Sequence, residues 1–155
     1  MGYTNYWSPK ELTREEIPEA FWSDCAAVIN AVLRKGIRLG DGVGKKEYKS
    51  GEELIGASQS ARTPCIVFNG LEELGEDYET FALYFDGDWS FCKTAHEPYD
   101  VAVKCILMLA KKYELLMPRD ENEGEPGGFS WDGDEGDPEY QDASEIITAF
   151  EIFNK

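Results

Sequence analysis

With 155 residues, of which 42% are hydrophobic and 13% aromatic, the chain is long and apolar enough to fold as one domain around its own core. Its formal net charge of −16 argues against nucleic acid and against an anionic membrane surface as partners, because both would repel it. The partner that this charge favours is a protein with a basic surface.

The first helix is predicted by two successive capping patterns. Residues 8–11 combine an N-cap serine with a proline and a glutamate, and residues 13–16 repeat the capping box, so a short turn should lead into a longer helix. Its apolar residues keep helical spacing as far as Val32, and Gly36 provides a stop. A short strand is expected at 37–39.

The middle of the chain predicts a loop followed by β-strands. Residues 40–60 show no clear periodicity and several turn residues, so we assign a loop there. Strands are expected at 64–68, 80–85 and 89–95, and the Asp86-Gly87 pair predicts a hairpin between the last two. The alternation of side chains within 80–85 favours a sheet with one face covered by helices.

A buried helix is predicted at 101–113, because this segment is apolar nearly all round except for Lys104, Lys111 and Lys112. A strand is expected at 115–117.

The C-terminal part combines an acidic loop with a last strand and helix. Residues 66–155 carry 22 acidic and six basic side chains, and an acidic loop is expected around 120–137. A strand at 129–131 and a helix starting at Asp137-Pro138 complete the chain. We therefore predict a single α+β domain, with a mostly antiparallel sheet of about four to five strands packed by three helices, in the order α-β-β-β-β-α-β-α.

No metal site or cofactor is predicted. The cysteines at positions 25, 65, 92 and 105 form no C-x-x-C pair, so they are expected to be reduced core residues. Residues 132–137 place carboxylates around glycine, as calcium requires, but the twelfth position of the EF-hand pattern is Ala143. A solvated acidic loop with Asp137 as a helix N-cap is the alternative that we favour.

No catalytic residue is assigned, and an enzyme is the less favoured class. The only histidine, His96, lies four residues from Cys92, but an inert packed thiol beside a loop histidine explains both. No P-loop, nucleophile elbow or zinc-protease motif is present. The N-terminus has no signal-peptide pattern and no stretch reaches the length of a membrane helix, so a cytoplasmic protein without membrane contact is expected.

The densest polar cluster runs from Lys93 to Asp100, where a strand turns into the buried helix. Such junctions expose backbone N–H groups and often bind ligands, but the same side chains also serve as caps. An exposed Lys93–Asp100 pair would contribute only about 0–1 kcal/mol to stability, so a structural role predicts a modest loss on its removal. Both alternatives stay open.

Several short elements occur together in this chain: residues 5–12, residues 68–70 with 79–81, Cys92-Lys93-Thr94-Ala95 with Pro98-Tyr99-Asp100, and residues 131–134. Together they resemble a family of small uncharacterised proteins encoded by bacteriophages, prophages and bacteria. The chain departs from that family at His96 and Glu97, where basic residues are frequent, and at Trp131, where serine is usual. The resemblance implies a phage-encoded accessory protein inside the host cell and brings no known activity.

Two functional hypotheses follow from these observations. In the first, the chain binds a basic surface of a host protein, with inhibition of a host defence system as the outcome, and does not contact nucleic acid directly. The acidic surface of this hypothesis consists of Asp132, Asp134, Glu135, Asp137 and Glu139.

In the second hypothesis the chain binds a small ligand or nucleotide at the strand–helix junction. Lys93 would meet an anionic group, Thr94 and Asn69 would form hydrogen bonds, Tyr99 or Trp131 would stack, and Asp100 and Asp132 would orient donors.

Overall fold

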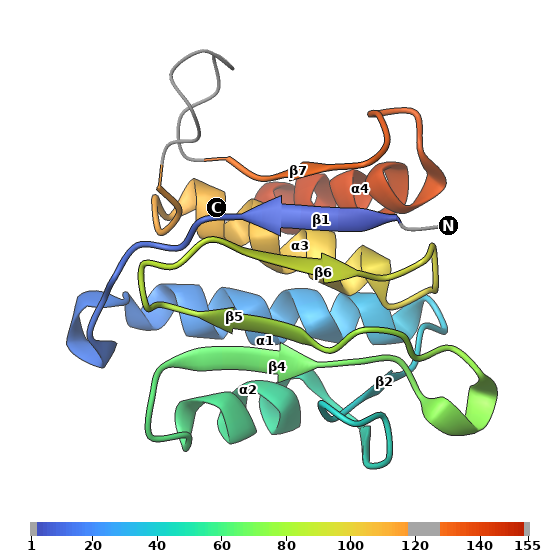
Figure 1. The fold of residues 1–155 in the computed structure, drawn as a ribbon, viewed down its shortest axis with the longest axis horizontal. Coiled ribbons are helices and arrows are strands. Elements are labelled where there is room, and N and C mark those ends of the chain that lie inside the picture. Colours follow the sequence, from blue (N-terminus) through green and yellow to red (C-terminus); the bar gives the residue numbers. More distant parts are fainter. Residues whose placement is uncertain (1–2, 118–127, 154–155) are drawn as a thin grey trace.

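A computed structural model describes residues 3–117 and 128–153, which form a layer of strands against a layer of helices (Figure 1). The strands are β1 (Thr4–Trp7), β2 (Leu39–Gly40), β3 (Glu47–Tyr48), β4 (Cys65–Phe68), β5 (Phe81–Tyr84), β6 (Ser90–Lys93) and β7 (Ser130–Trp131). The helices are α1 (Glu19–Arg34), α2 (Gly51–Gln59), α3 (Asp100–Lys112) and α4 (Pro138–Phe153), with 3-10 turns at Arg14–Glu16 and Glu72–Leu74.

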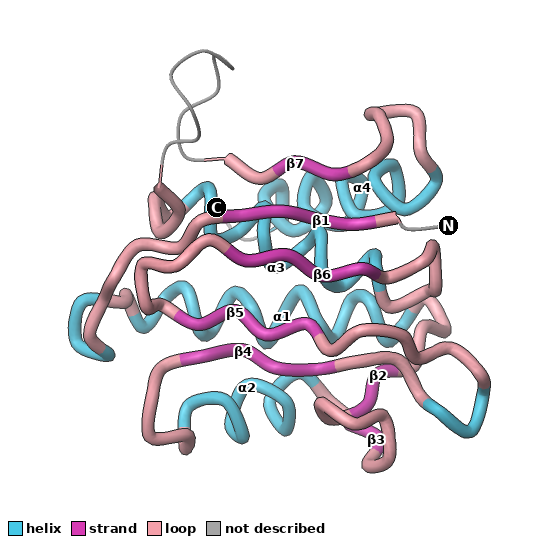
Figure 2. The backbone as a smooth tube through the Cα atoms, viewed as in Figure 1, coloured by secondary structure: helices cyan, strands magenta, loops and turns pink. Residues whose placement is uncertain are grey.

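The strand layer runs in the order β7, β1, β6, β5, β4 (Figures 1 and 2). β1 lies between β7 and β6 and pairs antiparallel with both, while β4 and β5 form a second antiparallel pair. The two groups meet at β5 and β6, where the backbone N–H of Glu79 donates to the carbonyl of Lys93 at 3.2 Å. The short β2–β3 ribbon joins this layer through a bridge between Gly40 and Asn69.

All four helices lie on one side of the strand layer, so the two faces of the sheet differ (Figure 1). Side chains that point toward the helices, such as Trp7, Phe81, Leu83 and Cys92, are almost fully buried. Their neighbours along each strand point away from the helices, because side chains alternate between the faces of a sheet. The core therefore lies between the strand and helix layers.

The predicted α+β class with antiparallel pairing is confirmed. The second capping pattern also acts as expected, because the carboxylate of Glu16 accepts from the backbone N–H and the hydroxyl of Thr13 just before α1. Among the described residues no helix is long and apolar enough to cross a membrane.

The predicted element order lacked two strands and a helix. β1 and β3 were not predicted, and α2 occupies part of the segment 40–60 that we assigned to a loop. α2 begins where the Ser50 hydroxyl accepts from the backbone N–H of Glu53, a capping signal that the irregular hydrophobicity of the segment obscured.

Two further predictions need correction, and one lies outside the described residues. Residues 8–11 form no helical turn, since Pro9 and Glu11 make isolated bridges with Leu116 and Asp86. Leu116 is therefore part of a single bridge and not of a strand at 115–117. Of the acidic loop expected around 120–137, residues 120–127 lie outside the described residues.

The predicted hairpin at Asp86-Gly87 connects strands that lie side by side without a continuous hydrogen-bonded ladder. Gly87 adopts a positive φ of 81°, as the turn requires. The backbone groups around this turn are used elsewhere, because the N–H of Leu12 donates to the carbonyl of Phe85.

Candidate functional site

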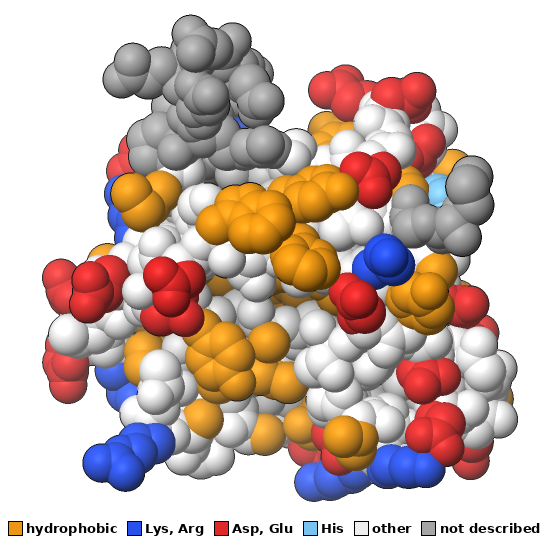
Figure 3. Space-filling model, viewed as in Figure 1, with side chains coloured by type: hydrophobic (Ala, Val, Ile, Leu, Met, Phe, Trp, Pro, Cys, Tyr) orange, Lys and Arg blue, Asp and Glu red, His pale blue; other side chains and the backbone are white. Residues whose placement is uncertain are grey.

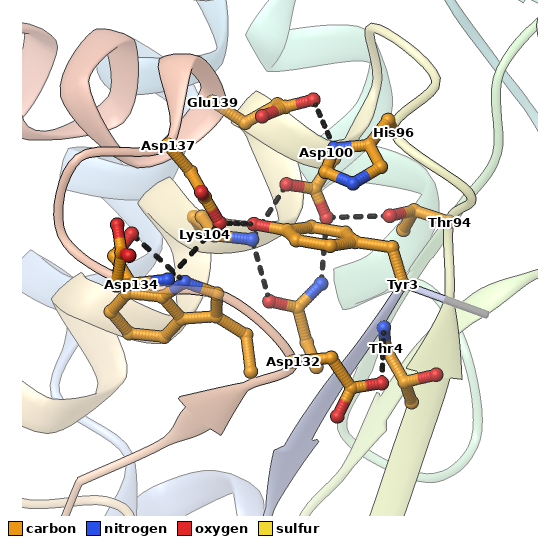
Figure 4. A network of polar contacts seen from close by, with 12 residues as sticks. Tyr3, Thr4, Thr94, His96, Asp100, Lys104, Asp132, Asp134, Asp137 and Glu139 are labelled. Atoms are coloured by element: carbon orange, nitrogen blue, oxygen red, sulfur yellow. Dashed lines mark hydrogen bonds and ion pairs between the residues drawn. The ribbon is translucent and has the colours of Figure 1, made fainter. Parts of the chain in front are cut away.

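A closed network of polar side chains occupies the junction between β6 and α3 (Figure 4). Asn5 from β1, Thr94 beyond β6, and Asp100 and Lys104 from α3 are all fully buried. Lys104 Nζ lies 2.6 Å from Asp100 Oδ2 and 2.9 Å from Asn5 Oδ1. The other carboxylate oxygen of Asp100 accepts from Asn5 Nδ2 and from Thr94 Oγ1, each at 2.7 Å.

Aromatic rings cover the buried ammonium group of Lys104. Its Nζ lies 4.5 Å from the ring centre of Tyr3 and 5.4 Å from that of Trp131. The Tyr3 hydroxyl donates to Asp137 Oδ2 at 3.0 Å, and its ring lies 3.7 Å from the ring of His96. These rings close the network toward solvent.

Burial and nearby charges shift the pKa values of Lys104 and Tyr3 in this network. Burial lowers the pKa of Lys104 below its ordinary value, while the nearby Asp100 carboxylate acts in the opposite direction. Burial, followed by the charge of Asp100, raises the pKa of Tyr3. The Lys104 ammonium group donates to Asp100 and Asn5, and both oxygens of Asp100 accept hydrogen bonds from protein groups, which is what a structural network requires.

A tight turn aligns these side chains. Ala95 and His96 both have left-handed backbones, with φ of 53° and 62°, which is uncommon for residues other than glycine. The backbone N–H of Thr94 donates to the carbonyl of Tyr3 at 2.9 Å, and the N–H of Glu97 donates to the carbonyl of Thr94 at 3.0 Å. The turn thus fixes Thr94 beside the first turn of α3.

The structure brings together only part of the ligand site that we predicted from the sequence. Thr94 and Asp100 are in contact, but Asp100 pairs with Lys104, and the pair with Lys93 that we considered does not form. Lys93 follows the inward-facing Cys92 and so points to the other face of the sheet. Thr94 and Asp100 have no accessible surface to offer a ligand.

The other predicted ligand-site residues lie apart. Tyr99 is buried in the core, where its hydroxyl donates to the carbonyl of Glu79 at 2.5 Å. The side chain of Asn69 holds the loop after β4, accepting from the N–H of Tyr78 and donating to its carbonyl, both at 3.0 Å. β4 is at the opposite edge of the strand layer from Trp131 in β7 (Figure 1).

Trp131 also borders a surface pocket of about 370 Å³ between α3, β7 and α4. Its ring stacks on Tyr140 at 4.8 Å and contacts Phe129 at 5.4 Å. None of the other residues of the predicted ligand site lines this pocket.

The predicted acidic surface divides into exposed and engaged carboxylates. Asp132, Asp134 and Glu135 are exposed, Asp137 is half-buried and accepts from Tyr3, and Glu139 is buried. Glu139 Oε1 lies 2.8 Å from His96 Nδ1, while its Oε2 is buried without a hydrogen-bond partner. In residues 3–117 and 128–153, no three His, Cys, Asp or Glu side chains are grouped so that they could hold a metal ion.

The outer face of the sheet, which the helices leave uncovered, presents aromatic side chains to solvent (Figure 3). Tyr84, Trp89 and Phe91 are 42%, 58% and 49% exposed. Phe91 lies directly opposite Tyr6 in the register of β6 and β1, and the ring of Trp89 is near both. We call Tyr6, Tyr84, Trp89 and Phe91 the aromatic face.

Sequence reasoning missed the aromatic face, although its signal was present. In a sheet with one solvated face, the outward positions are usually polar, yet here Tyr84 and Phe91 occupy them. A second missed residue is Lys104, which stood out as a charge within an otherwise apolar helix. Both cases required knowing which positions face the core.

Carboxylates border the aromatic face (Figure 3). Asp132 Oδ1 accepts from the Tyr6 hydroxyl at 2.9 Å, and its Oδ2 accepts from the backbone N–H of Thr4 at 3.2 Å. Asp86 and Asp88, both exposed, lie in the turn that leads to Trp89.

Comparisons with protein-family models, with curated proteins and with solved structures found no match to this chain.

Proposed function

We propose that this chain is an acidic phage accessory protein that binds a basic surface of a host protein through the aromatic face, and that this binding inhibits a host defence system. The phage setting rests on the family resemblance of the Cys-Lys-Thr-Ala-x-x-Pro-Tyr-Asp segment. The mode of binding rests on the outer face of the sheet.

One observation carries the proposed binding function: an uncovered sheet face on which Tyr6, Trp89 and Phe91 lie close together, with Trp89 58% exposed. Large aromatic residues are enriched at protein interfaces, because each buries much apolar area at a small cost in side-chain entropy. Contiguous exposed apolar patches are unusual on a monomer unless they serve for binding.

The charge of the chain favours a protein partner over a nucleic acid. Some sheets with exposed aromatic residues stack the bases of single-stranded RNA, but they depend on basic residues to attract the phosphates. Here the net charge is −16, and beside the aromatic face three carboxylates, of Asp86, Asp88 and Asp132, outnumber the one cation that points to the same side, Lys93. These carboxylates would repel phosphates and attract lysine and arginine side chains.

The binding proposal is tested with a double variant that removes two exposed rings, Trp89→Ala with Phe91→Ala. A matched control, Ile152→Ala with Phe153→Ala, removes two apolar side chains that are 63% and 84% exposed on α4, in the helix layer. Host proteins captured by the wild-type chain are identified by mass spectrometry, and their Kd values are then measured with purified proteins.

We expect the control to bind the captured protein as the wild-type chain does, and the double variant to bind at least tenfold more weakly, because central aromatic residues dominate interface energies. Equal binding by the double variant would exclude the aromatic face as the binding surface. Addition of the chain to the identified host protein, followed by an assay of that protein's activity, then tests inhibition.

Small-ligand binding is a second candidate function, supported by the 370 Å³ pocket beside Trp131, whose size is within the range of ligand sites. Native mass spectrometry of the purified chain tests it. A retained small molecule that Trp131→Ala abolishes would support this function, and a spectrum with the bare chain mass alone would count against it.

A further inference from the structure

We propose that His96 is a nucleophilic site: its Nε2 atom takes the acyl group of a small neutral ester and passes it to water, while the carboxylate of Glu139 holds the ring in the reactive form (Figure 4). This activity is separate from the proposed binding function, because it uses no residue of the aromatic face.

The partner of His96 is not the one that its sequence neighbours suggested. Cys92, four residues away, is fully buried, and its thiol lies 3.5 Å from the carbonyl of Glu79. His96 instead pairs with Glu139, which is 43 positions away in the first turns of α4. A carboxylate behind an imidazole ring is the arrangement that orients a histidine for nucleophilic or general-base chemistry.

The hydrogen bond between these side chains fixes the position of the ring proton. His96 Nδ1 lies 2.8 Å from Glu139 Oε1, and a carboxylate only accepts hydrogen bonds, so Nδ1 carries the proton. In the neutral ring the free electron pair is then on Nε2. Within the part of the chain that the structure describes, the ring makes no other hydrogen bond, and its side chain is 55% exposed. Nε2 is therefore available to a substrate from solvent.

Glu139 favours a positive charge on the ring. The residue is buried, and its Oε2 atom has no hydrogen-bond partner. The nearby Lys104 also feels the charge of Glu139, but its hydrogen bonds go to Asp100 and Asn5. A buried carboxylate with an unused oxygen is costly, and a cation beside it offsets that cost. Because transfer of an acyl group to Nε2 makes the ring positive, Glu139 stabilises the acylated state more than the free one.

The backbone and a neighbouring ring hold His96 in place. Ala95 and His96 keep left-handed backbones, a conformation that costs energy in residues other than glycine and that is concentrated at functional sites. The ring of His96 lies 3.7 Å from that of Tyr3, whose hydroxyl donates to Asp137 at 3.0 Å. The imidazole thus has little freedom to turn away from Glu139.

The transfer takes two steps. Nε2 forms a bond to the carbonyl carbon of the ester, and the bond from that carbon to the leaving oxygen breaks with its electron pair, which leaves an acyl-imidazolium ring and an alkoxide or phenolate. Water then attacks the same carbon, the carbon–nitrogen bond breaks, and a carboxylic acid and one proton are released as the neutral ring returns.

The surrounding charges select the class of acyl donor. Glu97, Asp137 and Glu139 lie beside the ring, and the chain as a whole carries a net charge of −16. Anionic donors such as acyl phosphates are repelled, whereas neutral esters are not.

The test measures steady-state hydrolysis of p-nitrophenyl acetate, a small neutral ester, by the full chain. Because His96 is the only histidine, its acylation by diethyl pyrocarbonate, followed by ultraviolet absorbance, reports on this residue alone. His96→Asn removes the nucleophile and keeps a residue that tolerates the left-handed backbone. Glu139→Gln removes the charge of the positioning carboxylate, and the control Glu97→Gln removes a charge next to His96. Circular dichroism shows whether each variant is folded.

We expect His96 to react with diethyl pyrocarbonate faster than N-acetylhistidine does, and His96→Asn to lose steady-state hydrolysis. Glu139→Gln should lower kcat about 10- to 100-fold with KM unchanged, as when an outer carboxylate that orients a histidine is removed, while Glu97→Gln keeps the wild-type kcat. A purely structural Glu139 would leave kcat of the folded variant unchanged.

Three results would overturn the proposal. The first is a wild-type His96 that reacts no faster than N-acetylhistidine, which decides the matter even if Glu139→Gln does not fold. The second is hydrolysis that survives in His96→Asn. The third is an acyl group that stays on His96 as a stable adduct in mass spectra, because the site would then not pass the group to water.

Discussion

At the scale of single residues, the main finding is that the most specific segment of the sequence folds inward. Thr94, Tyr99 and Asp100 are fully buried, and Asp100 pairs with Lys104 in place of Lys93. The modest loss of stability expected for an exposed pair therefore does not apply. Lys104 signalled this outcome, since a charge in a buried helix needs a partner.

We predict that Asp100→Asn lowers the free energy of unfolding by about 3–5 kcal/mol, because it leaves the ammonium group of Lys104 buried without a counter-charge. Lys104→Met in the same chain should restore part of that loss by removing the second charge. Lys93→Ala, whose side chain is outside the network, should change the value by less than about 1 kcal/mol. Urea denaturation measures all three, and an Asp100→Asn variant as stable as Lys93→Ala would contradict the structural role.

A second residue-scale prediction concerns pH. Burial raises the pKa of the Cys92 thiol from 9.0 to about 12. In the folded chain the thiol keeps its proton where the unfolded chain loses it, so its contribution to stability is complete below pH 9 and disappears as pH rises toward 12. Between these values the free energy of unfolding should fall more steeply in the wild-type chain than in Cys92→Ala, by up to about 1.4 kcal/mol per pH unit. Parallel curves for the two proteins would count against a buried thiol.

At the scale of elements, the features that could be predicted are those that depend only on residues close together in the sequence. The Thr13–Glu16 capping box, the stop at Gly36 and the alternation in β5 depend on neighbours in sequence, and all were predicted. β1 has only four residues, and its structure comes from pairing with β6 and β7, which are distant in sequence. The buried network could not be predicted for the same reason, since Asn5 meets Asp100 only after β1 is in place.

The contact between α1 and α2 gives an element-scale prediction. A Cβ atom added at Gly51 would lie 1.9 Å from the carbonyl oxygen of Ala26, so Gly51→Ala must separate the two helices. We expect it to lower the free energy of unfolding by about 1–3 kcal/mol. Gly56→Ala is the matched control in the same helix: a Cβ there meets nothing within 4 Å, and the change should stabilise by about 0.5–1 kcal/mol. The same sign for both variants in urea denaturation would contradict the packing of α1 on α2.

At the scale of the whole molecule, the two sides of the sheet carry different groups. The inner side buries a charge pair that holds β1 to α3, and the outer side presents rings and carboxylates. Asp132 and Trp131 are adjacent in sequence, but their side chains point to opposite sides of the sheet, because side chains alternate along a strand. The chain as a whole carries a net charge of −16.

This charge predicts a steep salt dependence for binding to the captured host protein. The screening length falls from about 10 Å at 0.1 M salt to about 3 Å at 1 M, so Kd should rise strongly over this range. A variant with Asp132→Asn, Asp134→Asn and Glu135→Gln should bind more weakly and respond less to salt. Glu15→Gln with Glu19→Gln and Glu53→Gln removes the same charge elsewhere and should keep most of the response. A Kd independent of salt would contradict electrostatic attraction to a basic partner.

The position of β1 between β6 and β7 has a consequence for biosynthesis. β1 is synthesised before both of its partner strands, since Asn5 pairs with Cys92 on one side and with Trp131 on the other. At about 5–20 residues per second, the second partner is made about 6–25 s after the first strand. Until β6 is made, Tyr6 and Trp7 have no strand to pair with, and the other edge of β1 stays unpaired until β7 follows, so β1 is an aromatic segment that chaperones can bind during this interval.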